Sequence, residues 1–207
     1  MSKIPTDLLK YELRKLQLKV SEESRSSFLT FVKKVWPEFV AGSHHKIIAE
    51  KFEDISRGKI KRLIVNMPPR HTKSEFASNL FPSWMMGKNP KLKIIQTTHT
   101  AELSYNFGRK VRNLFDQQEF KDVFPDVSLS QDSKAAGRFT TNKGGEYFAA
   151  GVGGAITGRG ADLLIIDDPH SEQDALSQTA MDNAYEWYTS GPRQRLQPGG
   201  AIVVVMT

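Results

Sequence analysis

Apolar residues recur at intervals of three and four through the first quarter of the chain, which is the pattern of amphipathic helices. Four leucines mark the first such stretch: Leu8, Leu9, Leu13 and Leu16. The interval returns between residues 28 and 35, and Ser43 can cap a third helix that ends at Gly58, where glycine suits a left-handed terminal residue. We therefore expect residues 1–58 to form a helical subdomain.

From residue 61 the pattern changes to short runs of consecutive apolar residues, which are typical of strands buried in a parallel sheet. Such runs occupy 62–67, 92–98, 162–167 and 201–207. Helical spacing returns between them, at 73–86, 103–114 and around 181–188. Alternating strands and helices predict crossover units, and so an α/β domain with a mainly parallel sheet over residues 59–207.

The segments between these elements carry turn and loop signals. Residues 116–136 are polar and contain Pro125, so we expect a connection without regular structure. RFTTN and EYFAA predict a hairpin that turns at 143–145. Seven glycines between 144 and 160 predict a loop that passes close to other backbone, and 191–200 is expected to be a loop.

Composition limits the class of protein. At 207 residues and 39% hydrophobic content, one α/β core with a small appendage is expected. The chain has no Cys, which excludes disulfides and cysteine-based zinc sites. With no long apolar run and charges throughout the first 20 residues, we expect no membrane span or secretory signal and a soluble, intracellular protein. A net charge of +6 favours polyanionic partners such as nucleic acid. Many basic proteins that have no such partners carry a similar charge.

The turn PPRHTKS joins an expected strand to an expected helix and carries the first candidate chemistry. In P-loop enzymes such a turn points backbone N–H groups at phosphate oxygens. There a lysine, here Lys73, reaches the β- and γ-phosphates, and a hydroxyl, here Ser74, binds Mg²⁺. The positions that usually hold glycine are Met67 and Thr72. A capped helix start with an incidental lysine explains the turn equally well, so a second motif has to decide.

The second motif is LLIIDD, an apolar run that ends in two carboxylates. A buried strand that delivers a carboxylate to its end is how P-loop enzymes hold Mg²⁺, which points to Asp167. Asp168 then lies where a base would orient or deprotonate the attacking water, a role more often taken by Glu. The alternative is a strand that runs into a helix, with Asp as its cap and Pro169 in its first turn.

Together these motifs resemble those of the large subunit of tailed-phage terminases. PPRHTKSE is similar to that family's degenerate Walker A, commonly PPRHGKSE, and ITGRGADLLIIDDP is similar to its Walker B with a glycine-rich lead-in. The likeness continues through WPEFVAGSHH, LKIIQTTHT and IVVVMT, and covers about residues 30–207. It implies a P-loop NTPase of the additional-strand type, and it implies that the family's C-terminal nuclease domain is absent from this chain.

The resemblance also implies roles for single residues. ATP with Mg²⁺ would be bound by the turn Pro69, Arg70, His71, Thr72, Lys73 and Ser74, with Asp167 on the metal, Asp168 as the catalytic carboxylate and Thr207 in the coupling motif. Thr72 replaces the family's usual glycine, so its side chain is expected to crowd the phosphates or strain the turn.

Two arginines and two histidines near these motifs have less defined roles. The resemblance to related motors implies that Arg70 in cis and Arg159 from a neighbouring subunit are candidates for the γ-phosphate. Each is also explained as a solvated or phosphate-steering arginine. His44 and His45 lack the i, i+4 spacing of a metal-binding pair on a helix, so we interpret them as packing or adenine-side residues.

The family's function supplies the expected partners. The chain would hydrolyse ATP to drive double-stranded DNA into a procapsid, in the cytoplasm of an infected bacterial host. It would act with the portal protein and the small terminase subunit, as a homo-oligomeric ring that is monomeric or weakly associated when isolated. Two alternatives stay open. One is a helicase-like ATPase, although a GKT turn and DExx are absent, and the other is a catalytically weak nucleotide- or DNA-binding module, which Thr72 makes conceivable.

Overall fold

A computed structural model describes residues 6–207, apart from the side chains of residues 6 and 132–134. Its strands form one sheet in the order β1-β7-β6-β2-β5-β4-β3. Their bounds are β1 Arg62–Asn66, β2 Lys93–Thr98, β3 Leu129–Ala135, β4 Arg138–Thr141, β5 Glu146–Gly151, β6 Ala161–Asp167 and β7 Leu196–Met206. The pairs from β1 to β5 are parallel, and β4 and β3 are added antiparallel at one edge.

The strand order assigns the fold to a specific class. β7 lies between β1, which precedes the PPRHTKS turn, and β6, which ends in Asp167. An extra strand at this place is what defines the additional-strand P-loop NTPases. The predicted α/β fold with a mainly parallel sheet is therefore confirmed.

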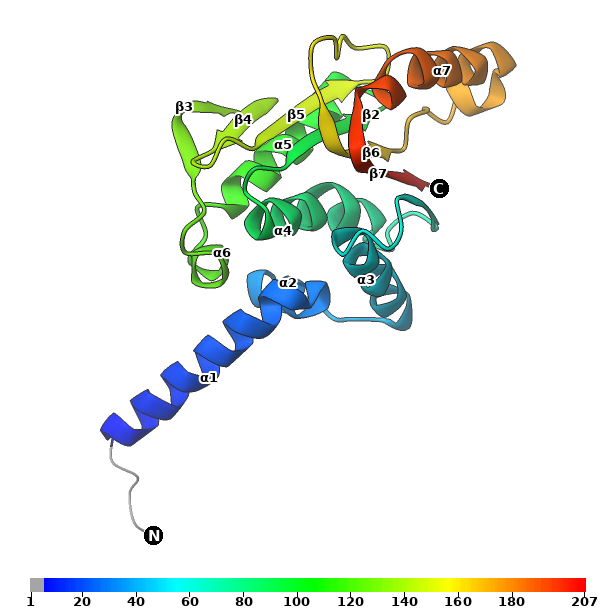
Figure 1. The fold of residues 1–207 in the computed structure, drawn as a ribbon. Coiled ribbons are helices and arrows are strands. Elements are labelled where there is room, and N and C mark those ends of the chain that lie inside the picture. Colours follow the sequence, from blue (N-terminus) through cyan, green and yellow to red (C-terminus); the bar gives the residue numbers. More distant parts are fainter. Residues whose placement is uncertain (1–5) are drawn as a thin grey trace.

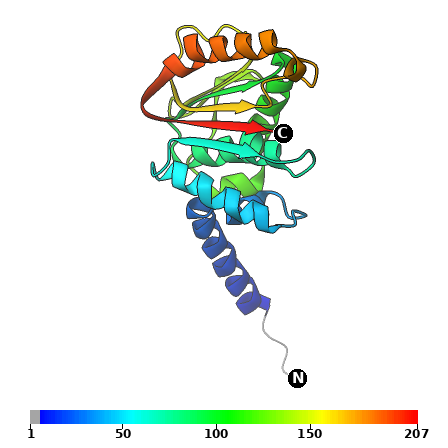
Figure 2. The same ribbon diagram turned by 90° about the vertical axis from the view of Figure 1, so that its right-hand side faces the viewer.

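Helices cover both faces of the sheet (Figures 1 and 2). They are α1 Thr6–Ser26, α2 Phe28–Val35, α3 Ser43–Ser56, the π-helix η1 Glu75–Leu80, α4 Phe81–Lys88, α5 Ala101–Leu114, α6 Gln118–Val123 and α7 Gln178–Ser190, with short 3₁₀ turns at Asp174–Leu176 and Pro192–Arg195. The helices from α2 to α6 share one aromatic-rich core with one face of the sheet. The opposite face has a smaller core, against which Tyr188 of α7 packs.

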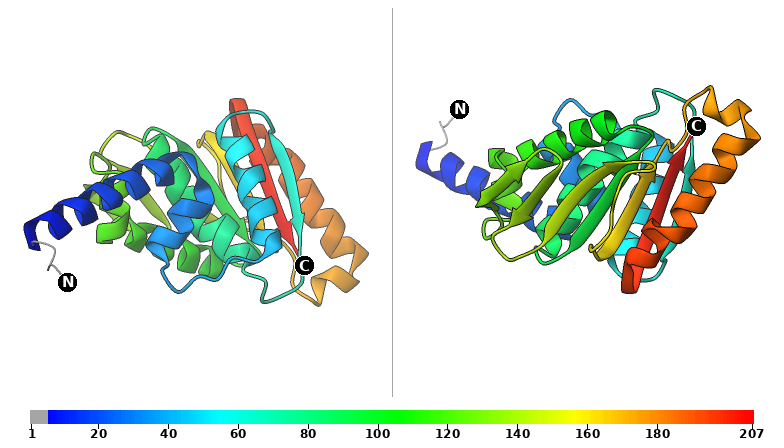
Figure 3. Two further views of the ribbon diagram at one scale, coloured as in Figure 1. Left: turned by 90° about the horizontal axis from the view of Figure 1, so that it is seen from below. Right: turned by 90° about the horizontal axis from the view of Figure 1, so that it is seen from above.

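The first helix is confirmed, but its leucine face is not buried. Leu9 and Leu16 are 60% and 59% exposed, and α1 extends away from the body of the molecule (Figure 3). By contrast, Phe28 and Phe52 of α2 and α3 are fully buried and pack with Trp84 or Phe81 of α4. The boundary at residue 58 stays a prediction, and α2 and α3 share the core of the domain that follows.

Two segments expected to be irregular contain regular structure. Residues 116–136 form α6 and β3, because Phe120 and Val123 are buried at helical spacing and Pro125 follows the helix instead of interrupting it. Strand β7 begins at Leu196, five residues earlier than expected. Its glycine-containing start, with Gly199 at a φ of 87°, sits where the pairing register with β6 shifts. The expectation of loops at both places was wrong.

The ends of two predicted elements show how side chains and glycines fix the backbone. The cap of α3 is Gly42 and not Ser43, and the Gly42 N–H donates to Nδ1 of His45 over 2.9 Å. Gly58 follows the helix with a φ of 72°, as predicted. A Cβ at Gly151 would lie 2.5 Å from the backbone nitrogen of Ala101, so the close approach predicted for the glycine-rich region occurs where β5 meets the start of α5.

Candidate active site at the carboxyl edge of the sheet

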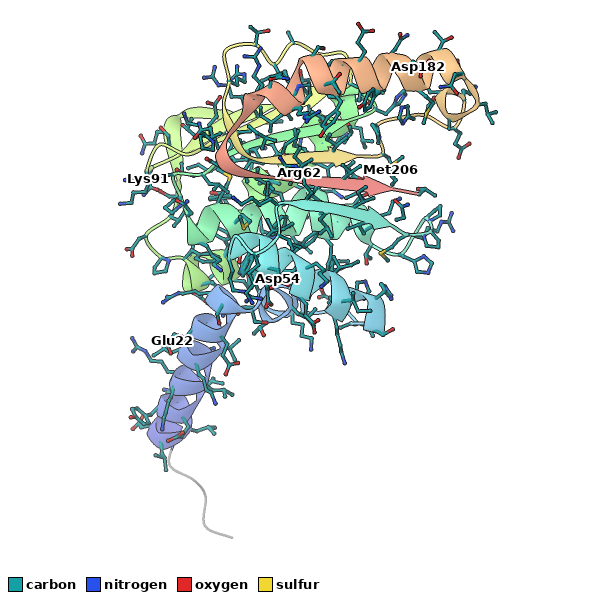
Figure 4. All side chains as sticks on the ribbon, turned by 45° about the vertical axis from the view of Figure 1, so that its right-hand side comes forward. Glu22, Asp54, Arg62, Lys91, Asp182 and Met206 are labelled. Carbon is teal, nitrogen blue, oxygen red and sulfur yellow. The ribbon has the colours of Figure 1, made fainter. Side chains whose placement is uncertain are left out.

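The motif residues meet at the carboxyl edge of the parallel strands. The PPRHTKS turn follows β1, Asp167 and Asp168 stand at the end of β6, and Thr207 follows β7. Figure 4 marks this edge by Met206 and the opposite, amino edge by Lys91. Since the carboxyl ends of adjacent parallel strands lie side by side, three segments that are far apart in sequence converge here.

The turn after β1 has two non-glycine residues in the left-handed region. Arg70 has a φ of 64° and Thr72 a φ of 60°. A β-branched residue at such an angle is sterically disfavoured, and glycine is the residue that adopts it freely. The strain expected at Thr72 is therefore present in its backbone.

Lys73 is the buried cation of this edge. Its side chain is 8% exposed, and its Nζ lies 3.0 Å from a carboxylate oxygen of Asp168. The same ammonium donates to the Thr207 hydroxyl over 2.8 Å. Lys73 thus joins the ends of β1, β6 and β7 at one point.

Asp167 is the buried anion, with 1% exposure. It accepts hydrogen bonds from the Ser74 hydroxyl over 3.0 Å and from the Ser78 hydroxyl over 2.6 Å. Burial raises the pKa of Asp167 to about 6; the negative charge of Asp168 adds to this, and the two serine hydrogen bonds and Lys73 oppose it. A hydroxyl and a carboxylate 3.0 Å apart form a hard-oxygen pair of the kind that Mg²⁺ prefers, so the residues fit the expected ion.

Two further residues of the site, Ser78 and Gln96, were not predicted from the sequence. Ser78 is fully buried one helical turn after Ser74, and the amide nitrogen of Gln96 donates to its hydroxyl over 2.9 Å. The repeat of serine at 74 and 78 was a visible signal, because residues four apart share a helix face. Gln96 could not be found in this way, because its contact crosses from β2.

Asp168 is held at a sharp bend and faces solvent. Its φ is 42°, its N–H donates to the carbonyl of Val205 over 2.8 Å, and its own carbonyl accepts from the N–H of His99 over 3.2 Å. The side chain is 38% exposed and lies beside a cavity of about 430 Å³ lined also by Pro69 and Thr207. The neighbouring carboxylates therefore have different surroundings, one buried between serines and one open beside the lysine.

The remaining residues of the turn differ in their contacts. His71 is exposed, and its Nδ1 lies 2.9 Å from the carbonyl oxygen of Pro69. Arg70 is exposed on the same turn. The Thr72 hydroxyl faces α3, where it lies 2.5 Å from Nε2 of His45.

The structure does not bring Arg159 to this site. Arg159 precedes β6 at the amino edge, where it donates to Glu146 and its guanidinium carbon lies 3.8 Å from the centroid of the Phe148 ring. The length of β6, about 20 Å at the usual rise per residue, separates it from Asp168. Arg159 therefore has no contact with the site of its own chain, and a role from a neighbouring subunit stays a prediction.

The strand order and the residues that converge at its carboxyl edge have the arrangement of the additional-strand P-loop fold. No family model matches the sequence, and no curated protein sequence matches it. Among solved structures, the chain is similar to the large terminase from a thermophilic bacteriophage in complex with ATP-γ-S, with a TM-score of 0.45 and 10% identity over 85% of this chain and 36% of that one. It is also similar to the same terminase with ADP, with a TM-score of 0.44 and 12% identity over 76% and 38%.

These likenesses concern the arrangement of the fold only. The chain spans little more than a third of the length of the terminase chains that it matches. Within residues 6–207, no helix has the length and apolar content that a bilayer crossing needs.

Proposed function

We propose that this chain is the ATPase portion of a viral DNA-packaging motor, which hydrolyses ATP with Mg²⁺ to move double-stranded DNA into a procapsid. The observation that carries the proposal is the meeting of Lys73 with Asp168 and of Ser74 with Asp167 at one sheet edge. A capped helix start with an incidental lysine does not account for that meeting, because the lysine would then have no reason to be buried beside the end of β6.

Each residue at the edge has a chemical task in hydrolysis. Lys73 offers a fixed positive charge for the β- and γ-phosphates, where negative charge develops during transfer. Ser74 and Asp167 would hold Mg²⁺, which supplies charge neutralisation for the phosphate oxygens when it is bound. Phosphate oxygens would compete with Asp168 for the Lys73 ammonium, and this competition frees the Asp168 carboxylate to orient a water molecule.

The proposed DNA partner has separate support. The net charge of +6 suits a polyanion, and the PPRHTKSE and DDP motifs resemble those of phage terminases more than the GKT and DExx motifs of helicases. The portal protein, the small terminase subunit, the ring on the procapsid and the location in the cytoplasm of an infected bacterium belong to the same proposal.

The proposal is tested by ATP turnover with Mg²⁺, alone and with added double-stranded or single-stranded DNA. A packaging ATPase is expected to hydrolyse ATP and to change its rate of hydrolysis when double-stranded DNA is added. A response to single strands alone would favour a helicase-like ATPase. Nucleotide binding without any turnover would favour a catalytically weak binding module.

A further inference from the structure

Thr72 occupies a backbone position that favours glycine, and its side chain has a defined partner. The residue has a φ of 60° inside the turn that joins β1 to the following helix. Its hydroxyl lies 2.5 Å from Nε2 of His45, which stands 27 positions earlier, in the first turn of α3. This contact links the N-terminal helices to the candidate phosphate-binding turn.

The direction of the hydrogen bonds around His45 can be assigned. Its Nδ1 accepts from the N–H of Gly42 over 2.9 Å, so the proton of the neutral ring is on Nε2. That Nε2–H donates to the Thr72 hydroxyl, which in turn donates to the carbonyl of His71 over 2.7 Å. Nε2 of His44 lies 3.1 Å from the same nitrogen and can share the proton as an acceptor.

The ring of His45 is itself fixed in place. It is 6% exposed, with its centroid 4.7 Å from that of Phe39 and 4.9 Å from that of Phe76. Burial, followed by the adjacent His44 and His71, lowers the pKa of His45, which favours the neutral ring that the hydrogen bonds require. A packed and neutral donor can hold the Thr72 hydroxyl without moving.

We propose that His45 is a positioning residue for the phosphate-binding turn. It holds the Thr72 side chain on the α3 side of the turn, so that a threonine can occupy a glycine position without entering the space in front of Lys73. The proposal rests on the function proposed above in so far as the turn binds phosphate. It explains how this chain can differ from the glycine-containing pattern and keep a usable turn.

Two substitutions of His45 separate its two hydrogen bonds. In His45→Gln the side-chain amide reaches the place of Nε2 and can still donate to Thr72, whereas the Gly42 bond is lost. In His45→Asn the shorter amide reaches the place of Nδ1 and keeps the Gly42 bond, whereas Thr72 loses its donor. If His45 only caps α3, His45→Asn should resemble wild type more than His45→Gln does. If His45 positions Thr72, His45→Gln should resemble wild type more than His45→Asn does.

The measurement is the Kd of a fluorescent ATP analogue with Mg²⁺ for wild type, His45→Gln, His45→Asn, Thr72→Gly and His45→Asn/Thr72→Gly. We expect His45→Asn to weaken binding about tenfold, the effect of losing one buried hydrogen bond, and His45→Gln to stay near wild type. In the Thr72→Gly background His45→Asn should have no further effect. Equal Kd values for the two single His45 variants, or an undiminished effect of His45→Asn in the Thr72→Gly background, would overturn the proposal.

Thermal unfolding of the same five proteins keeps the two proposals distinguishable. If wild type binds no nucleotide, the proposed function fails, and the Tm values still report whether residues 45 and 72 are coupled. Non-additive Tm changes in the cycle then support the His45–Thr72 link, and additive changes overturn it.

Discussion

Asp167 and Asp168 are neighbours in sequence with opposite surroundings, and their substitutions should have opposite effects. Asp167 is 1% exposed between Ser74 and Ser78, whereas the Asp168 side chain is 38% exposed beside Lys73. Desolvation penalises the charged form of Asp167, whereas the Asp168 side chain is accessible to a water molecule. We therefore expect the first to limit stability and the second to limit turnover.

Asp167→Asn should make the free energy of unfolding of the metal-free protein less dependent on pH. The pKa of Asp167 is raised to about 6 in the folded protein from 3.8. The stability it contributes is therefore fully present below pH 3.8 and lost as the pH rises through about 6. By pH 8 the buried carboxylate costs on the order of 3 kcal/mol, part of which the neutral amide should recover. Chemical denaturation at pH 5 and pH 8 measures this, and an unchanged pH slope in the variant would contradict it.

Asp168→Asn should leave binding of Mg²⁺ and ATP largely intact and reduce turnover by about 10² to 10⁴, because an amide cannot take a proton from water. Asparagine suits the test because it tolerates the positive φ of 42° at this residue. Calorimetric binding and steady-state hydrolysis are measured on the same preparation. If binding is lost here and spared in Asp167→Asn, the two carboxylates have exchanged roles.

At the residue scale, the sequence predicted the charged and hydroxyl residues at the strand ends. It did not predict Gln96 and His45, which hydrogen-bond to residues of the site. Asp167 and Asp168 end one apolar run and Lys73 and Ser74 follow another after a short turn, so a parallel sheet brings all four to one edge. Gln96 and His45 reach the site through contacts 18 and 27 positions apart, between different elements. No local pattern encodes those distances.

At the scale of elements, the turn after β1 combines backbone strain with the residues proposed to bind phosphate. Thr72→Gly should remove the cost of a positive φ, about 1–2 kcal/mol, and lose the hydrogen bond to His45, about 1 kcal/mol. The free energy of unfolding is therefore expected to change little. ATP affinity should be maintained or tightened, because His45 already holds the Thr72 side chain away from the space in front of Lys73 and glycine adopts the positive φ freely. A large loss of affinity would mean that Thr72 supplies a needed contact.

The spacing of apolar residues predicted the longer helices and strands correctly and failed for short ones. The runs that became β2 and β6 are buried on both faces, so they stand out in the sequence. By contrast α6 has six residues and buries only Phe120 and Val123, too few positions for a period to emerge. The start of β7 contains a proline and two glycines in a register shift, and these residues are ordinarily the signal of a loop.

At the scale of the whole molecule, the position of Arg159 requires a neighbour for any catalytic role. It is held by Glu146 and Phe148 at the amino edge, at the far end of β6 from Asp168. If it completes the site of an adjacent subunit, Arg159→Ala should lower the rate per assembled subunit by about 10³ to 10⁵. The wild-type rate per subunit should also rise with protein concentration.

A mixture of Lys73→Ala and Arg159→Ala tests this arrangement. At some interfaces in the mixture, the intact Lys73 of an Arg159→Ala subunit would face the intact Arg159 of a Lys73→Ala subunit. The activity of the mixture should therefore exceed the sum of the activities of the separate variants. If the subunits co-assemble and no rescue occurs, while Arg70→Ala is as inactive as Arg159→Ala, then Arg70 in cis is the better candidate.

The proposed ATPase function is tested most directly by the rate of Mg²⁺-dependent ATP hydrolysis by Lys73→Ala, compared with Lys91→Ala. Lys91 is an exposed lysine at the amino edge of the sheet, opposite the site (Figure 4), so its loss controls for the removal of one positive charge. Removing Lys73 takes away the charge that would meet the β- and γ-phosphates. We predict that Lys73→Ala abolishes hydrolysis and that Lys91→Ala retains the wild-type rate. Undiminished turnover in Lys73→Ala would contradict it.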